Sequence, residues 1–141
     1  MSEVSVQAAD FEVGAEIDTL SAGDAEAGAV ASFVGLVRGG EVAAMTLEHY
    51  PGMTEQALAE IVTQARGRWS LRRVRVIHRF GRLLPGERIV FVGVAARHRG
   101  DAFAACEFIM DYLKTRAPFW KKEETPQGAR WVDARETDDA A

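Results

Sequence analysis

The sequence predicts an α+β fold in which helices pack on a mainly antiparallel sheet. Two stretches, residues 54–69 and the first half of 103–123, place apolar side chains at helical spacing, whereas several shorter runs are β-branched or alternate as strands do. The predicted order is strand, strand, helix, strand, strand, helix, and strands that follow one another directly favour antiparallel pairing. With 141 residues, 48% of them hydrophobic, we expect one domain spanning 1–141.

The first third of the chain contains three predicted strands. Residues 4–7 alternate like a short strand, and residues 11–20 indicate a modest helix or a turn-rich segment. Residues 28–37 form a β-branched run bounded by glycines, which predicts a buried strand. The glycine pair at 39–40 favours a tight reversal, so we expect residues 42–49 to run back as the second strand of a hairpin.

Two more strands are predicted after the first long helix. Residues 73–80 alternate strictly, with Val74, Val76 and His78 on one face, which is typical of a strand with at least one covered face. Residues 88–96 follow a proline-glycine turn and form the most hydrophobic strand of the chain.

The stretch 103–123 is the most informative part of the sequence. It opens as a helix whose first turn Asp101 is placed to cap, and its apolar face consists of Phe103, Cys106, Met110 and Leu113. The helix delivers Lys114, a proline ends it, and an apolar extended run then delivers Lys121 and Lys122. A helix end followed by a stiffened segment can hold two ammonium groups in fixed positions, which favours a binding or catalytic site. The alternative is that Lys114 only complements the helix dipole.

The charge distribution places any anion site late in the chain. The formal net charge is −4, but seven of the 21 acidic residues and none of the 17 basic ones precede Arg38. Arg38 ends a predicted strand, and His98 and Arg99 lie where a strand leads into a helix, a favourable place for a phosphate or carboxylate. The alternative is that all three side chains are ordinary solvated groups at strand ends.

Several classes of protein are excluded by what the sequence lacks. No apolar run is long enough to span a bilayer and the N-terminus has no export signature, so we expect a soluble, cytoplasmic protein. The single cysteine, Cys106, is expected to be a buried, inert thiol. Because His49, His78 and His98 lie in separate elements without ligand spacing, we predict no metal site. Phosphate-loop and serine-elbow motifs are also missing.

Longer strings of residues resemble one known family. They are TLEHYPGMTEQALAEI (46–61), VIHRFGRLLPGERIVFVGV (76–94), ARHR (96–99), FIMDYLKTRAPFWKKE (108–123) and RWVDARE (130–136). Together they resemble the large, catalytic subunit of molybdopterin synthase, in the same order from about residue 28 to residue 136. Residues 1–27 match only weakly, and residues 134–141 are expected to form a disordered tail.

The resemblance implies a sulfurtransferase of molybdenum cofactor biosynthesis with an α/β hammerhead fold. In that family a small ubiquitin-like subunit carries a thiocarboxylate on its C-terminal Gly-Gly tail and inserts the tail into the large subunit. Two sulfurs pass to cyclic pyranopterin monophosphate and form the dithiolene of molybdopterin. The resemblance also implies a homodimer within a heterotetramer, and no permanently bound cofactor or metal.

The family's functional residues carry over by position. Its essential lysines fall on Lys114 and Lys121, and its binding residues fall on Arg38, His98, Arg99, Lys122 and Glu123. Our hypothesis is that Lys114 transfers a proton during sulfur attack and contacts the glycine end of the tail, and that Lys121 helps to hold the substrate and the incoming tail. The sequence departs from the family in one place, because only a short loop follows Arg38 here.

Two other classes of function are compatible with the residues. A nucleic-acid-binding module would explain lysines interleaved with Phe119 and Trp120, although the acidic N-terminal quarter argues against it. Strongly salt-dependent binding to single strands would favour that class. A purely structural partner subunit would instead use residues 117–120 as an interface, and co-purification with a Gly-Gly-tailed protein without pterin turnover would favour it.

Overall fold

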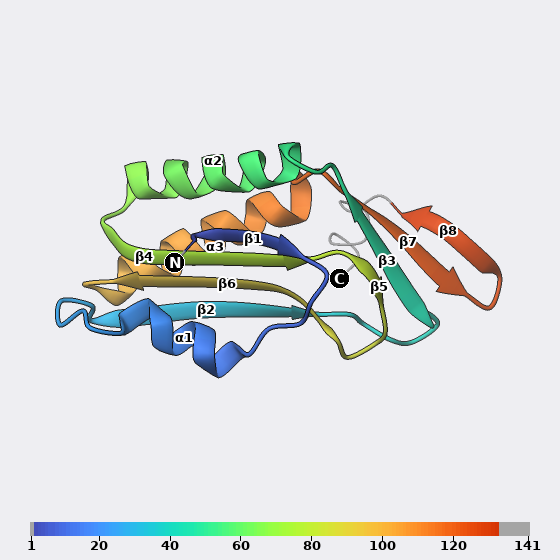
Figure 1. Cartoon of the computed structure of the whole chain (residues 1–141), viewed down its shortest axis with the longest axis horizontal. Helices are drawn as coiled ribbons and strands as arrows, with labels where there is room; N and C mark the ends of the chain where they lie inside the picture. The colour runs from blue at the N-terminus through green and yellow to red at the C-terminus, as the bar shows by residue number, and fades with distance from the viewer. Residues whose placement is uncertain (1, 133–141) are drawn as a thin grey trace.

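The computed structural model describes residues 2–132, which form two four-stranded sheets and three helices (Figure 1). The strands are β1 (Val4–Gln7), β2 (Ala29–Leu36), β3 (Ala44–His49), β4 (Leu71–Arg79), β5 (Gly81–Leu83), β6 (Arg88–Ala96), β7 (Phe119–Thr125) and β8 (Gly128–Val132). The helices are α1 (Val13–Ser21), α2 (Met53–Arg68) and α3 (Arg99–Thr115). The expected tail at 134–141 lies outside the described residues.

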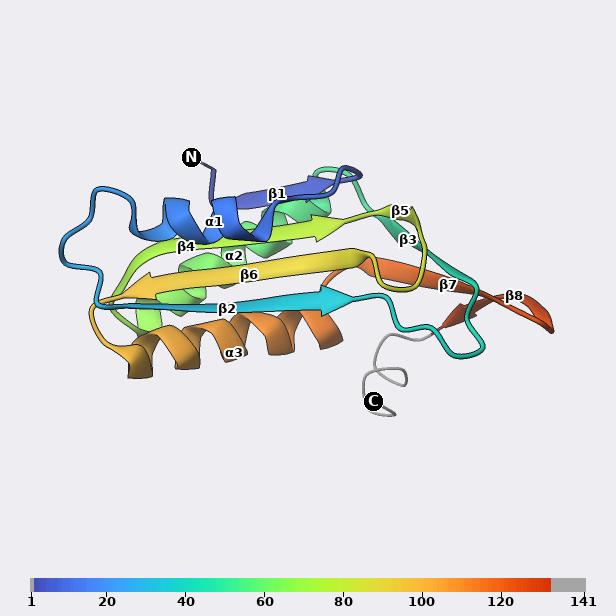
Figure 2. The same cartoon turned by 90° about the horizontal axis from the view of Figure 1, so that it is seen from below.

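The larger sheet has the strand order β1-β4-β6-β2, and only the β1–β4 pair is parallel. Alternate residues of β4 and β6 face opposite sides, so both faces of this sheet are apolar and both are covered. Helices α2 and α3 pack on one face, and the short helix α1 covers the other (Figure 2). The prediction of helices on a mainly antiparallel sheet is confirmed. Helix α1 lies in the segment where a modest helix or turns were expected, but its packing on the second face of the sheet was not predicted.

Glycine lets the backbone approach closely at the start of β2. A Cβ atom on Gly28 would lie 2.1 Å from the carbonyl oxygen of Arg97, and the Gly28 N–H donates to the carbonyl of Ala96 at 2.9 Å. Any larger residue would push the first residues of β2 away from β6.

The smaller sheet, with the order β5-β3-β7-β8, is entirely antiparallel and has its own small core of Val37, Met45, Leu47 and Leu83. The predicted hairpin between 28–37 and 42–49 is therefore wrong, because β2 pairs with β6 and β3 pairs with β5 and β7. The glycines at 39–40 do not close a two-stranded turn. Val37 is buried, its backbone is bonded to the turn before β6, and the chain then crosses into the second sheet.

Helix α3 begins two residues earlier than the sequence indicated. His98 occupies the N-cap position, and Asp101 lies in the first turn without making a capping hydrogen bond, so its predicted capping role is wrong. Phe103 is 65% exposed and does not belong to the core face. That face is formed by Ala102, Ala105, Cys106, Ile109, Met110 and Leu113.

A buried threonine ties α2 to the segment between α3 and β7. The Oγ1 of Thr54 accepts a hydrogen bond from the Tyr50 N–H at 3.0 Å and donates to the Pro118 carbonyl at 3.4 Å. Because β7 starts at Phe119, this hydroxyl helps to fix the point from which β7 departs.

Candidate functional site

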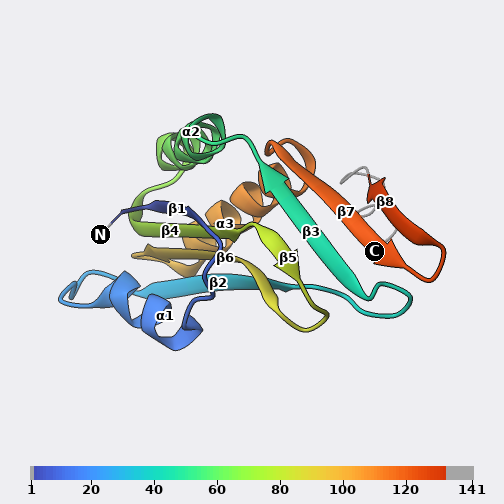
Figure 3. The same cartoon turned by 45° about the vertical axis from the view of Figure 1, so that its right-hand side comes forward.

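A pocket of about 520 Å³ lies where the two sheets meet the C-terminal end of α3. Figure 3 shows β7 leaving the end of α3 and running beside β3. The walls are mostly apolar, with side chains from β2, β6 and α3, and the polar lining residues are Arg38, His78, Lys114, Lys121 and Glu123. Such a cavity, apolar with a few convergent polar groups, is typical of small-molecule sites.

Three cationic side chains predicted from the sequence line this single pocket. Lys114 comes from the last turn of α3, Lys121 from β7 and Arg38 from the segment after β2. The Lys114 Nζ lies 5.9 Å from the centroid of the Phe33 ring, which places its ammonium over an aromatic wall. Among the described lining residues Glu123 is the one carboxylate, so the pocket carries an excess of positive charge. This arrangement favours an anionic ligand.

The alternation of β7 separates the predicted stretch 121–123 into two faces. Lys121 and Glu123 line the pocket, and Glu123 is almost fully buried with its Oε1 3.5 Å from the Arg130 Nη2. Lys122 is absent from the pocket lining, and its Nζ lies 5.5 Å from the centroid of the Trp131 ring on β8. The structure therefore brings Lys121 and Glu123 into the pocket but leaves Lys122 outside it.

His78 is a pocket residue for which sequence reasoning found no role. Its ring stacks on Phe119 with 3.7 Å between centroids, and its Nδ1 lies 2.8 Å from the carbonyl oxygen of Arg79. A carbonyl oxygen only accepts, so Nδ1 carries the proton and Nε2 is an acceptor. Burial, with additional contributions from Lys121 and His49, lowers the pKa of His78 to about 4, although the hydrogen bond to the Arg79 carbonyl acts in the opposite direction. The one sequence feature that could have indicated its burial is that His78 shares a strand face with Val74 and Val76.

The predicted pair His98 and Arg99 lies far from the pocket of the same chain. Both side chains are exposed at the N-terminal end of α3, and Lys114 is in its last turn. At 1.5 Å per residue the two ends of this helix are roughly 20 Å apart. A single chain therefore does not bring the pair together with Lys114.

The remaining sequence-based exclusions concern cysteine, metals and membranes. Cys106 is buried, as predicted, and burial raises the pKa of its thiol to about 11, which disfavours the reactive thiolate. Residues 2–132 contain no group of three or more His, Cys, Asp and Glu side chains that could hold a metal ion. In the same part of the chain, no helix is long and apolar enough to cross a membrane.

The fold and the pocket together define an α+β protein with a mostly apolar pocket that carries an excess of positive charge. The family model described as "MoaE protein" matches residues 6–116. The molybdopterin synthase catalytic subunit of Ralstonia nicotianae is 63% identical over 145 residues, covering all of this chain and 82% of the relative. That of Escherichia coli is 63% identical over 135 residues, covering 93% of this chain and 89% of the relative.

Solved structures agree with the sequence comparisons. The molybdopterin biosynthesis MoaE protein of Burkholderia ambifaria superposes with a TM-score of 0.85 at 59% identity, over 99% of this chain and 95% of that one. The crystal structure of molybdopterin synthase from Staphylococcus aureus gives a TM-score of 0.85 at 27% identity, over 94% and 98% of the two chains. The chain therefore belongs to the MoaE family of molybdopterin synthase catalytic subunits, which confirms the resemblance and the expected fold.

Proposed function

We propose that this chain transfers two sulfur atoms from the thiocarboxylate of a small ubiquitin-like subunit to cyclic pyranopterin monophosphate, as the catalytic subunit of a molybdopterin synthase. The observation that supports the proposal is the convergence of Arg38, Lys114 and Lys121 on one largely apolar pocket. The three residues come from separate parts of the chain, and they are among the residues on which the family's functional positions fall.

The chemistry requires a positively charged pocket. A pterin phosphate and a thiocarboxylate are both anions and repel one another, so bringing them within reacting distance costs free energy in water and more in an apolar cavity. Fixed cations on the walls offset that repulsion without having to reorganise during the reaction. The mostly apolar lining excludes water and strengthens each of these interactions.

Each pocket residue has a distinct proposed role. Arg38 binds the phosphate or the pterin, and Lys121 holds the substrate and the incoming tail. Lys114 transfers a proton during sulfur attack and contacts the C-terminal glycine of the partner. Glu123, whose carboxylate lies next to Arg130, contributes to the binding wall. A Gly-Gly tail has no side chains, so it can enter a cavity of this size together with a substrate.

His98 and Arg99 reach a pocket only if a second copy supplies them. Strand β2 lies at the edge of the larger sheet, and it exposes Val30, Phe33 and Leu36. An open strand edge with exposed apolar side chains favours a partner. A two-fold axis crossing β2 and α3 would set the N-terminal end of one α3 against the C-terminal end of the other.

The proposed assembly is therefore a homodimer that carries one small subunit on each copy. We place this assembly in the cytoplasm, without a permanently bound cofactor. Its two pockets would each combine Arg38, Lys114 and Lys121 of one copy with His98 and Arg99 of the other.

The direct test is product formation. The purified chain is mixed with thiocarboxylated small subunit and cyclic pyranopterin monophosphate, and the dithiolene product is detected by mass. Lys114→Ala should abolish sulfur transfer and leave the dimer intact in size-exclusion chromatography. Lys122→Ala is the matched control, because its ammonium lies outside the pocket, and it should retain most of the activity. Sulfur transfer by the Lys114→Ala protein would remove Lys114 from the mechanism.

A further inference from the structure

Arg38 depends on its backbone for its position. Its side chain is exposed at the pocket, and within residues 2–132 no hydrogen bond or ion pair holds its guanidinium. The residue before it is fixed on both sides, since the Val37 N–H donates to the Glu87 carbonyl at 2.9 Å and the Val37 carbonyl accepts from the Gly86 N–H at 2.8 Å. The turn before β6 therefore fixes the backbone position from which the Arg38 side chain extends.

That turn is closed by the carboxylate of Glu87. The Glu87 N–H donates to the Leu84 carbonyl at 3.0 Å, and the Leu84 N–H donates to the Glu87 Oε2 at 2.7 Å. Gly86 supplies the φ of 90° at which the chain reverses. The Glu87 side chain thus accepts the hydrogen bond of the Leu84 N–H at the open end of the turn. Without this bond the turn would be more mobile.

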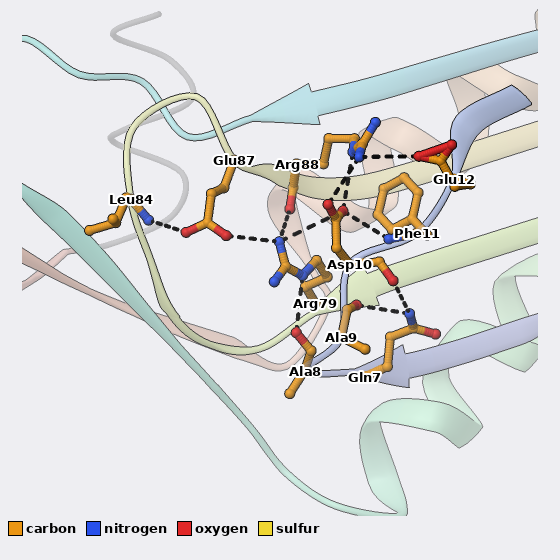
Figure 4. Close-up of polar contacts among 10 residues, drawn as sticks. All are labelled: Gln7, Ala8, Ala9, Asp10, Phe11, Glu12, Arg79, Leu84, Glu87 and Arg88. Carbon is orange, nitrogen blue, oxygen red and sulfur yellow. Dashed lines mark hydrogen bonds and ion pairs between the residues drawn. The ribbon is translucent and has the colours of Figure 1, made fainter.

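Arg79 connects this turn to the larger sheet (Figure 4). Its buried guanidinium donates from Nη1 to the Glu87 Oε1 at 3.4 Å and to the Arg88 carbonyl at 3.0 Å, and from Nε to the Ala8 carbonyl at 3.1 Å. The Asp10 Oδ1 lies 3.9 Å from the same Nη1. Charge-assisted bonds from a buried, planar guanidinium are the least mobile polar contacts available to a loop.

We propose that Glu87 and Arg79 are positioning residues for substrate binding: they fix the 84–87 turn, and the turn fixes the backbone from which Arg38 reaches the substrate anion. The inference rests on the proposed function of Arg38. Neither Glu87 nor Arg79 lines the pocket, so their effect on the substrate passes through the two backbone bonds of Val37.

The test is a double-mutant cycle between Glu87 and Arg38, with cyclic pyranopterin monophosphate as the varied substrate. Glu87→Ala should raise KM for the pterin about tenfold with kcat changed less than twofold, because the binding cation is displaced while Lys114 is not. In the Arg38→Ala background the same substitution should have no further effect on KM. Glu87→Ala should also accelerate hydrogen exchange of the Val37 and Gly86 amides.

Glu16→Ala is the matched control for loss of an ion pair. Glu16 on α1 pairs with Arg75 on β4 at 3.0 Å, with both side chains largely buried, and neither lines the pocket. This variant should lose stability and keep the wild-type KM. If Glu87→Ala does not fold, Glu87→Gln is used, since its amide oxygen can still accept from the Leu84 N–H but its charge attraction to Arg79 is gone.

The possible outcomes separate the two proposals. An unchanged KM in the Glu87 variant, or an equal effect with and without the Arg38 side chain, overturns the positioning role and leaves the proposed function standing. A wild-type protein that forms no dithiolene product refutes the proposed function itself. The inference is supported if Glu87→Ala raises KM only when the Arg38 side chain is present, and if Glu16→Ala leaves KM unchanged.

Discussion

His78 should make the folded protein sensitive to mild acid. Burial holds its pKa at about 4, compared with 6.5 for an exposed histidine, and Lys121 and His49 are the charged or titratable groups that act on it. The stability linked to His78 is fully present above pH 6.5 and is lost as pH falls toward 4, because the unfolded chain then binds a proton that the folded chain does not. With 1.36 kcal/mol per pKa unit, the loss between pH 7 and pH 5 is about 2 kcal/mol.

The assay is urea unfolding at pH 7 and pH 5 at a single protein concentration. His78→Phe keeps a ring against Phe119 but cannot titrate, so its free energy of unfolding should fall by about 2 kcal/mol less than that of the wild type. Equal pH dependence in the wild type and the His78→Phe protein would refute the assignment of a buried, neutral imidazole.

Three further predictions concern the scaffold. Gly28→Ala should lower Tm because its methyl group meets a backbone carbonyl, whereas Gly67→Ala, in open space on α2, should raise the free energy of unfolding by about 0.5–1 kcal/mol. Thr54→Val should cost about 1–3 kcal/mol in urea unfolding and Thr54→Ser much less, since serine keeps the hydroxyl. The Arg88 guanidinium lowers the pKa of Asp10 to about 2, so stability present above pH 3.8 is lost toward pH 2. Asp10→Asn should reduce that loss in an acid titration followed by circular dichroism.

The sequence predicted most elements because their patterns are local. The alternation of β4 and the hydrophobicity of β6 predicted strands close to those observed, and Lys114 and Lys121, predicted from a helix end followed by proline, line the same pocket. The partner of each strand is not a local property. The glycine pair at 39–40 favoured a hairpin, but the buried side chain of Val37 and its two backbone bonds to the 84–87 turn direct the chain into the other sheet.

The site was only partly predictable for a similar reason. Period-two alternation separates Lys121 from Lys122 once β7 is known to be a strand: Phe119, Lys121 and Glu123 line the pocket, whereas Lys122 shares the other face with Trp120. His78 could not be recognised because the ring that stacks on it lies about forty residues later in the chain, on β7. The length of α3, which keeps His98 and Arg99 away from Lys114 of the same chain, is not part of any of the sequence motifs.

The charge asymmetry of the sequence also has a structural explanation. The N-terminal carboxylates of Asp10, Glu16 and Asp24 pair with arginines on β4 and β6. These pairs neutralise the arginine-rich outer surface of the larger sheet, while the cations around the pocket keep their charge excess. A protein with a net charge of −4 can therefore still present a local attraction to an anion.

Because the pocket has walls from both sheets, any molecule that occupies it bridges the larger sheet and the smaller sheet, whose small core contacts the larger sheet through Ile89. The binding free energy of the ligand therefore stabilises β7 and β8 against local opening away from the rest of the protein. The catalytic subunit should accordingly be most resistant to proteolysis along this ribbon while substrate is held and least resistant after product has left.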